Sequence, residues 1–205
     1  TTRAGQRIKG TGWIAGERLV MTAGHNLFLH NRGGWARSVQ VIPARNGRHA
    51  PFNSFTVTAS KLITTHGWKE RQELSSDVGG IIIPSEYSSE FIPQIGFFAI
   101  RALDDATLRR ARTNIVGYPV RVYPVGSQWW HGRRVLPELG ERTFRYNIDT
   151  TVGQSGSPAF VLHNGERFVI GIHNVDVGRF NQAVRVNSEV LEKIREWKQI
   201  ANDDA

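Results

Sequence analysis

The chain has 205 residues, no cysteine and a formal net charge of +8 at pH 7, from 26 Lys and Arg against 18 Asp and Glu. Without cysteine, no disulfide can hold the fold, and thiol chemistry and cysteine-based zinc sites are excluded. We find no apolar run of membrane-spanning length, so no membrane partner is expected. The basic residues are scattered and lack the interleaved aromatic residues of a base-stacking groove, so no nucleic-acid partner is expected either.

The first half of the chain predicts a β-rich unit over residues 1–84. Hydrophobic residues make up 40% of the chain and 21 residues are glycine, a composition that favours many short strands joined by tight turns. Its apolar runs are rich in β-branched and aromatic residues and are separated by Gly, Asn and Pro. We expect strands at residues 12–15, 18–22, 39–42, 55–58, 61–63 and 80–83.

A polar stretch bounded by two prolines, residues 85–94, predicts a connection between this unit and a second β-rich unit over residues 95–186. Several runs of the second unit alternate apolar with polar residues, which is the period of a half-buried strand. We expect strands at residues 97–100, 114–118, 121–123, 128–130, 144–148, 158–162, 168–172 and 183–186.

The end of the chain, residues 187–205, predicts a helix followed by a short tail. Asn187 and Ser188 can cap a helix, and Val190, Leu191, Ile194 and Trp197 then recur at helical spacing. A second helical turn is indicated more faintly near residues 104–109. The compartment stays open between secretion, which is favoured, and the cytoplasm.

The segment Gly153-Gln154-Ser155-Gly156-Ser157-Pro158 places a serine hydroxyl in a glycine-rich loop, where backbone amides can converge on one point. Such a run by itself often closes an ordinary hairpin. Two further segments change its weight. An apolar run ends in Thr22-Ala23-Gly24-His25, and another begins at Asp77-Val78. The chain order is therefore His, Asp, Ser.

These motifs, with Gly10-Thr11-Gly12-Trp13, Asp149-Thr150 and Gly171-Ile172-His173, resemble the trypsin-like serine endopeptidases, and most closely their glutamyl endopeptidase branch. The matching residues extend from about residue 10 to about residue 187. The resemblance implies an all-β fold of two six-stranded antiparallel β-barrels with a C-terminal helix. In that arrangement residues 1–84 carry His25 and Asp77, residues 95–186 carry Ser155, and the active site lies between the barrels.

The resemblance also implies roles for these residues. His25 would take the proton of Ser155, and Asp77 would orient the His25 ring and stabilise its charged form. The amides of Gly153 and Ser155 would form the oxyanion hole. No metal or other cofactor is implied, a protein or peptide substrate is expected, and the chain is expected to be a monomer. Gln154 carries no charge to pair with a freed N-terminus, so activation by such a salt bridge is not expected.

Specificity is the less settled part of the sequence. Thr150 and His173 match the residues with which glutamyl endopeptidases bind a glutamate side chain, whereas Asp149 stands where trypsin-type enzymes keep the carboxylate that binds Arg or Lys. We favour glutamate before the scissile bond, and keep a basic preference through Asp149 as the alternative. Asp176 would disfavour glutamate if its negative charge lay near the pocket. A different class also stays open, namely a protease-like scaffold acting as a non-catalytic binding or toxin module.

Overall fold

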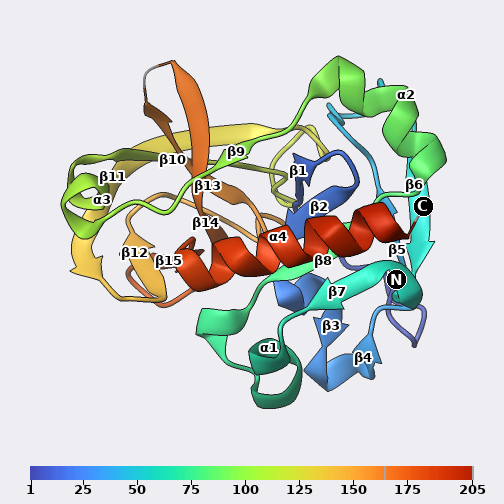
Figure 1. Cartoon of the computed structure of the whole chain (residues 1–205), viewed down its shortest axis with the longest axis horizontal. Helices are drawn as coiled ribbons and strands as arrows, with labels where there is room; N and C mark the ends of the chain where they lie inside the picture. The colour runs from blue at the N-terminus through green and yellow to red at the C-terminus, as the bar shows by residue number, and fades with distance from the viewer. Residues whose placement is uncertain (164, 205) are drawn as a thin grey trace.

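The computed structural model describes residues 1–163 and 165–204, and the side chains of residues 134–137 and 163 are not described either. It is mostly β with a C-terminal helix (Figure 1), as predicted. Asn164 of the second unit and Ala205 of the predicted tail lie outside the described residues. No helix in the described ranges combines the length and the apolar character needed to cross a membrane.

The first half contains a four-stranded antiparallel sheet in the order β1-β2-β8-β7 and two separate strand pairs, β3–β4 and β5–β6. The six strands that the sequence predicts here are all present within one or two residues, but their pairing leaves β1 and β5 unpaired with each other. The bounds are β1 Trp13–Gly16, β2 Leu19–Thr22, β3 Phe28–Leu29, β4 Gly34–Trp35, β5 Ser38–Val41, β6 Phe55–Thr58, β7 Leu62–Thr64 and β8 Gly79–Ile82.

The second half forms a seven-stranded sheet in the order β13-β10-β11-β12-β15-β14-β9, and β13 also pairs with β14. The segment 121–123, predicted as a strand, is not one, because it lies between Pro119 and Pro124, which lack the N–H groups that a ladder requires. The bounds are β9 Ala99–Ile100, β10 Arg112–Gly117, β11 Trp129–Leu139, β12 Thr143–Tyr146, β13 Pro158–His163, β14 Glu166–Asp176 and β15 Asn181–Arg185.

Four α-helices accompany the sheets within the described ranges. The predicted connection at residues 85–94 forms α2, which buries Phe91 and Ile92 and tolerates Pro93 in its last turn. The predicted C-terminal helix is α4, capped by the Asn187 side chain, which accepts from the Val190 N–H. The division of the chain into units at these points stays a prediction. The bounds are α1 His66–Arg71, α2 Ser85–Ile95, α3 Asp105–Arg110 and α4 Ser188–Asp203.

Helix α4 crosses both halves (Figure 1). Its buried residues Ile194 and Trp197 belong to one apolar cluster with Met21 from β2 and Ile172 from β14. A side chain in place of Gly80 in β8 would meet the Trp197 ring at 2.9 Å, so the helix lies directly on the strand that follows Asp77. The packing of α4 therefore fixes the two halves against each other at the seam where the predicted site residues meet.

Candidate active site

His25 and Asp77 form a buried hydrogen-bonded pair in the first half. His25 lies in the short 3₁₀ turn after β2, and Asp77 ends the turn before β8. Asp77 Oδ2 is 2.7 Å from His25 Nδ1, and Asp77 Oδ1 accepts from the His25 backbone N–H at 2.8 Å. The Asp77 side chain is 1% exposed and the His25 side chain 31% exposed. The carboxylate is thus closed off from water while the far side of the imidazole stays accessible.

The local sequence explains why Asp77 is held in this position. The Thr64 hydroxyl donates to the Val78 carbonyl at 2.7 Å, and the Thr65 hydroxyl donates to the Ser76 carbonyl. Both threonines lie at the end of β7, the neighbour of β8 in the sheet. The carbonyls on either side of Asp77 are therefore fixed before its side chain makes any contact, which reduces the entropy lost on ordering it.

The loop that carries Ser155 is tied to the residues around His25. The Ser155 carbonyl accepts from the Asn26 side chain at 2.8 Å and from the Thr11 N–H at 2.9 Å. Asn26 follows His25 directly in the chain, so this bond brings the serine loop beside the imidazole. The Ser155 hydroxyl makes no hydrogen bond among the described residues, and catalytic serine–histidine bonds are often long before a substrate binds.

The two glycines of the serine loop are required by close backbone approach. Gly153 and Gly156 have φ values of +100° and +89°. A Cβ at Gly153 would meet the Tyr118 carbonyl at 2.5 Å, and one at Gly156 would meet the Thr11 carbonyl at 2.2 Å. Within the described ranges the N–H groups of Gly153 and Ser155 donate to no other protein group. Both amides are therefore free to bind an external acceptor.

His173 lies beside the serine loop and is held from both sides. Its carbonyl accepts from the Gly156 N–H at 2.7 Å and its N–H donates to the Ser157 carbonyl at 2.9 Å. The ring is buried, and the Tyr146 hydroxyl lies 2.6 Å from His173 Nδ1. Burial lowers the pKa of His173 from 6.5 to about 4, so the ring is neutral at neutral pH.

The Tyr146 hydroxyl has polar contacts on two sides. Tyr146 is fully buried and burial raises its phenol pKa, so the hydroxyl keeps its proton. It lies 2.6 Å from His173 Nδ1 and 3.4 Å from the Gln182 carbonyl. A phenol that donates to Nδ1 leaves the His173 proton on Nε2, whereas a phenol that donates to Gln182 accepts from Nδ1–H. Tyr146 was not singled out from the sequence, although a tyrosine at an alternating buried strand position needs a polar partner.

The other predicted pocket residues lie differently. The Thr150 hydroxyl donates to Asn181 Oδ1 at 2.7 Å and is half-buried. The Asp149 side chain is 86% exposed, and its nearest ion-pair partner is His131 at 3.7 Å. Asp176 is exposed and accepts from the Gly178 N–H. The structure therefore gathers His173 with the serine loop, but leaves the Asp149 carboxylate in solvent.

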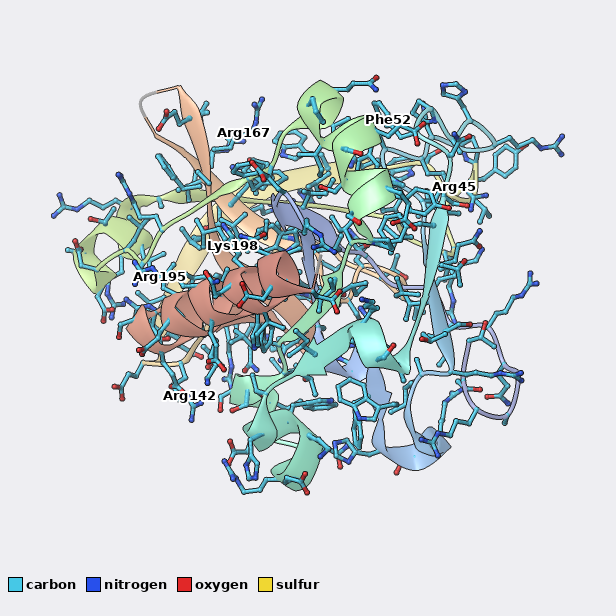
Figure 2. All side chains as sticks on the ribbon, turned by 45° about the vertical axis from the view of Figure 1, so that its right-hand side comes forward. Arg45, Phe52, Arg142, Arg167, Arg195 and Lys198 are labelled. Carbon is cyan, nitrogen blue, oxygen red and sulfur yellow. The ribbon has the colours of Figure 1, made fainter. Side chains whose placement is uncertain are left out.

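Among the described residues no group of three His, Asp or Glu side chains is close enough together to hold a metal ion. Figure 2 labels four arginines that come from separate elements. Arg142 and Arg195 lie by α4, whereas Arg45 and Arg167 line the same large cavity.

Comparison with known proteins finds similarity to proteases. No family model matches it. It is 30% identical over 200 residues to the glutamyl endopeptidase of Bacillus licheniformis, covering 93% of this chain and 60% of that protein. It is also 25% identical over 190 residues to a Bacillus subtilis protein named extracellular metalloprotease, covering 91% of this chain and 57% of that protein. The chain thus spans about 60% of the length of these curated relatives.

A solved structure of a Glu endopeptidase in complex with MPD superposes with a TM-score of 0.77 at 22% identity, covering 97% of this chain and 96% of that one. At this identity the match establishes the fold. It confirms the fold class that the sequence resemblance implied, although the strands of the first half do not join into one six-stranded sheet. The chain is a chymotrypsin-fold protein that is similar to the glutamyl endopeptidases.

Proposed function

We propose that the chain is a serine endopeptidase in which Ser155 is the nucleophile, His25 the general base and Asp77 its orienting carboxylate. One observation carries this proposal: the buried Asp77 carboxylate contacts His25 Nδ1 at 2.7 Å, at the point where the serine loop is tied to Asn26. An aspartate at Nδ1 leaves Nε2 without a proton and ready to accept one. The similarity to glutamyl endopeptidases over 93% of this chain supports the same activity.

The reaction follows from these positions. Ser155 Oγ attacks the scissile carbonyl carbon while its proton passes to His25 Nε2, and the N–H groups of Gly153 and Ser155 donate to the resulting oxyanion. The C–N bond then breaks, and His25 returns the proton to the leaving amine. Water, deprotonated by His25, hydrolyses the acyl ester and restores the Ser155 hydroxyl.

The preferred residue before the scissile bond is glutamate, bound through His173. A neutral His173 that carries its proton on Nε2 donates a hydrogen bond to the glutamate carboxylate of the substrate. A carboxylate buried in the pocket would instead repel that substrate. Asp149 supports a basic preference poorly, because an 86% exposed carboxylate is solvated and screened. Thr150 belongs to the same proposed pocket; its hydroxyl donates to Asn181 Oδ1 in the free protein and has to turn toward the substrate to donate to a carboxylate.

The chemical step is tested by labelling with a serine-directed fluorophosphonate, followed by mass spectrometry of the modified peptide. We expect one label, on Ser155, that is absent from Ser155→Ala and retained in Ser89→Ala, a matched change on the exposed face of α2. Labelling that persists in Ser155→Ala would reject the nucleophile. An unlabelled parent protein would favour the non-catalytic binding module.

Specificity is tested with peptides that differ only in having Glu, Gln, Asp or Arg before the scissile bond. We expect the highest kcat/KM for Glu, and a loss in His173→Ala that is at least about tenfold larger for Glu than for Gln. A preference for Arg that is lost in Asp149→Asn would establish the basic alternative in its place. Equal losses across the four peptides would remove His173 from the specificity role.

A further inference from the structure

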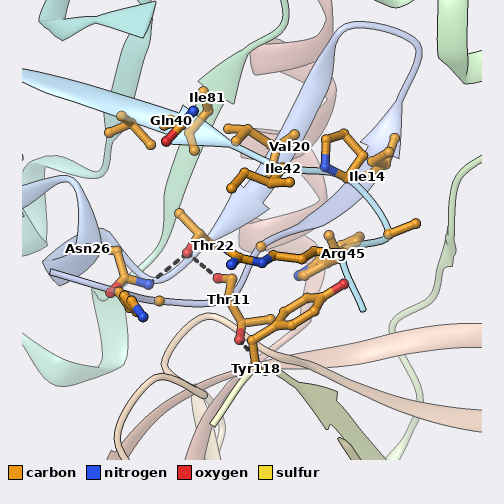
Figure 3. Close-up of a pocket in the computed structure, with 18 of the residues that line it drawn as sticks. Thr11, Ile14, Val20, Thr22, Asn26, Gln40, Ile42, Arg45, Ile81 and Tyr118 are labelled. Carbon is orange, nitrogen blue, oxygen red and sulfur yellow. Dashed lines mark hydrogen bonds between the residues drawn. The ribbon is translucent and has the colours of Figure 1, made fainter. Parts of the chain in front are cut away.

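A large open cavity, lined by residues of both halves, borders β1 and β5 (Figure 3). Its volume is about 1260 Å³, and it reaches the surface, because exposed residues such as Ile8 and Gln40 line it. His25, Ser155 and His173 are not among its lining residues. Thr11 and Asn26, which bind the Ser155 carbonyl, do line it, so the cavity adjoins the candidate active site. Small-molecule pockets typically measure ~300–1,000 Å³, so the cavity has room for more than a small ligand.

One wall of the cavity belongs to the apolar core of the first half. Val20 and Ile81 belong to the buried cluster of that core and also line the cavity, and Figure 3 shows Val20 near Ile42 and Ile81 near Gln40. Val39 and Val41 of β5 pack against the same cluster but are only half-buried. Apolar side chains of an occupant would be buried against this wall.

Of the two strands that border the cavity, β5 offers unpaired backbone groups. In the part of the chain that the structure describes, β1 pairs as a strand only with β2 and β5 only with β6. The outer edge of β1 is already used at Ile14, whose carbonyl accepts from the Phe98 N–H at 3.0 Å. The outer side of β5 already accepts extended backbone at its first residue, since the Ser38 carbonyl accepts from the Thr1 ammonium at 2.7 Å. Backbone groups alternate sides along a strand, so the N–H and carbonyl of Gln40 face the same side as those of Ser38. An unpaired edge of this kind is a template for an added strand.

The charged residues of the cavity are mostly basic. Arg7, Lys9, Arg45 and Arg167 line it, with Glu166 as the acidic exception. Arg45 lies at one end, next to Tyr118 (Figure 3), where its Nε donates to the Gly47 carbonyl at 2.9 Å. Such a rim favours an occupant that carries negative charge at its ends.

We propose that this cavity, the β1–β5 groove, binds an extended polypeptide strand that has apolar side chains at alternate positions and acidic residues at its ends. The strand pairs with the free backbone groups of β5, its apolar side chains enter the space beside Val39 and Val41, and its acidic end meets Arg45. Strands of about five or six residues are typical of globular proteins, which suits the run from Ser38 to Ile42 that lines the groove before Pro43, which has no N–H to pair. The proposal does not depend on the protease activity.

The proposal is tested with fluorescein-labelled Asp-Val-Thr-Val-Thr-Val-Asp and fluorescence anisotropy, using the Ser155→Ala protein so that no peptide is cleaved. One comparison peptide has Pro at its central position, which removes an N–H and a strand conformation. A second has Lys at both ends. We expect saturable binding of the acidic peptide, at least about tenfold tighter than either comparison peptide, and weakened by salt.

Two variants locate the binding. Val41→Asp places a carboxylate on the apolar wall and is expected to weaken binding of the acidic peptide at least about tenfold. Since that change touches the core, Arg45→Glu provides the second variant, which should reverse the preference between acidic-ended and lysine-ended peptides. Arg195→Glu, on the exposed face of α4, is the matched charge control and should change neither.

Three results would overturn the proposal. The first is no saturable binding of the acidic peptide, and the second is equal affinity for the proline-interrupted peptide. The third is a preference that Arg45→Glu leaves unchanged. Sedimentation of the protein alone tests whether a second copy of the chain occupies the groove instead. Self-association that Arg45→Glu abolishes would assign the groove to that second copy.

Discussion

Replacing Tyr146 by phenylalanine tests the hydrogen bond that holds His173. The change removes the Tyr146 hydroxyl from a fully buried site. His173 Nδ1 then loses its partner, which lies 2.6 Å away in the parent protein. An unsatisfied buried acceptor costs ~1–3 kcal/mol. The ring can escape part of that cost by moving its proton to Nδ1, but then Nε2 presents a lone pair to the substrate carboxylate in place of a donor.

We therefore expect kcat/KM for Glu peptides to fall about 10- to 100-fold in Tyr146→Phe, since ~1.4 kcal/mol is a factor of ten. The kcat/KM for Gln peptides should fall less, because the glutamine side chain can turn its NH2 group toward a lone pair, whereas a carboxylate has no donor. The rate of fluorophosphonate labelling at Ser155 should stay near that of the parent, because the nucleophile and its base are untouched.

The assay is a pair of kcat/KM measurements on peptides that differ only in Glu or Gln, with urea unfolding of each variant as a stability readout. Tyr87→Phe is the matched control, because the Tyr87 ring packs on Phe55 and its hydroxyl makes no hydrogen bond within the described residues. A Glu-to-Gln ratio that Tyr146→Phe leaves unchanged, alongside a loss of stability, would mean that Tyr146 only supports the fold.

Three further outcomes are expected. Burial lowers the pKa of His173 from 6.5 to about 4, so between these pH values the unfolded chain binds more protons than the folded chain. The free energy of unfolding should therefore fall by up to about 3 kcal/mol as the pH drops from 6.5 to 4. Urea unfolding of His173→Gln should lack that decline. Asp77→Asn should lower kcat on the order of 10³- to 10⁴-fold with little change in KM. Asp176→Asn, at an exposed aspartate, should retain activity. A mild effect of Asp77→Asn would contradict the orienting role of Asp77. Asn26→Ala removes one of the two donors to the Ser155 carbonyl and should lower kcat/KM about tenfold in peptide assays. Its melting temperature should stay within a few degrees of that of the parent protein. Undiminished turnover would show that the remaining donor suffices.

The resemblance of the motifs implied the pairing of His25 with Asp77, and the two side chains lie 2.7 Å apart. The same resemblance implied the fold class, which the comparison confirms. Six of the eight strands described in the first half were predicted from β-branched runs between Gly, Asn and Pro. The two-residue strands β3 and β4 are too short to give such a run.

Other features depend on contacts that no local pattern encodes. The Tyr146 bond to His173 joins residues 27 positions apart, and only the register of the second sheet brings them together. Helix α2 was expected as a polar connection because two prolines bound it, but Phe91 and Ile92 give it an apolar face that packs on the first half. Asp149 has the expected position in the chain, yet its side chain turns to solvent, which a motif cannot reveal.

The Ser155 carbonyl accepts hydrogen bonds from two donors of the opposite half, the Thr11 amide and the Asn26 side chain. Turnover is thereby linked to docking: a mild denaturant, a clashing substitution or a cleaved linker that parts the halves would separate alcohol from imidazole while each half still kept its strands. Peptide hydrolysis should then be lost at a lower denaturant concentration than the circular dichroism signal of the strands. The rate of hydrolysis is therefore a sensitive measure of the contact between the two halves.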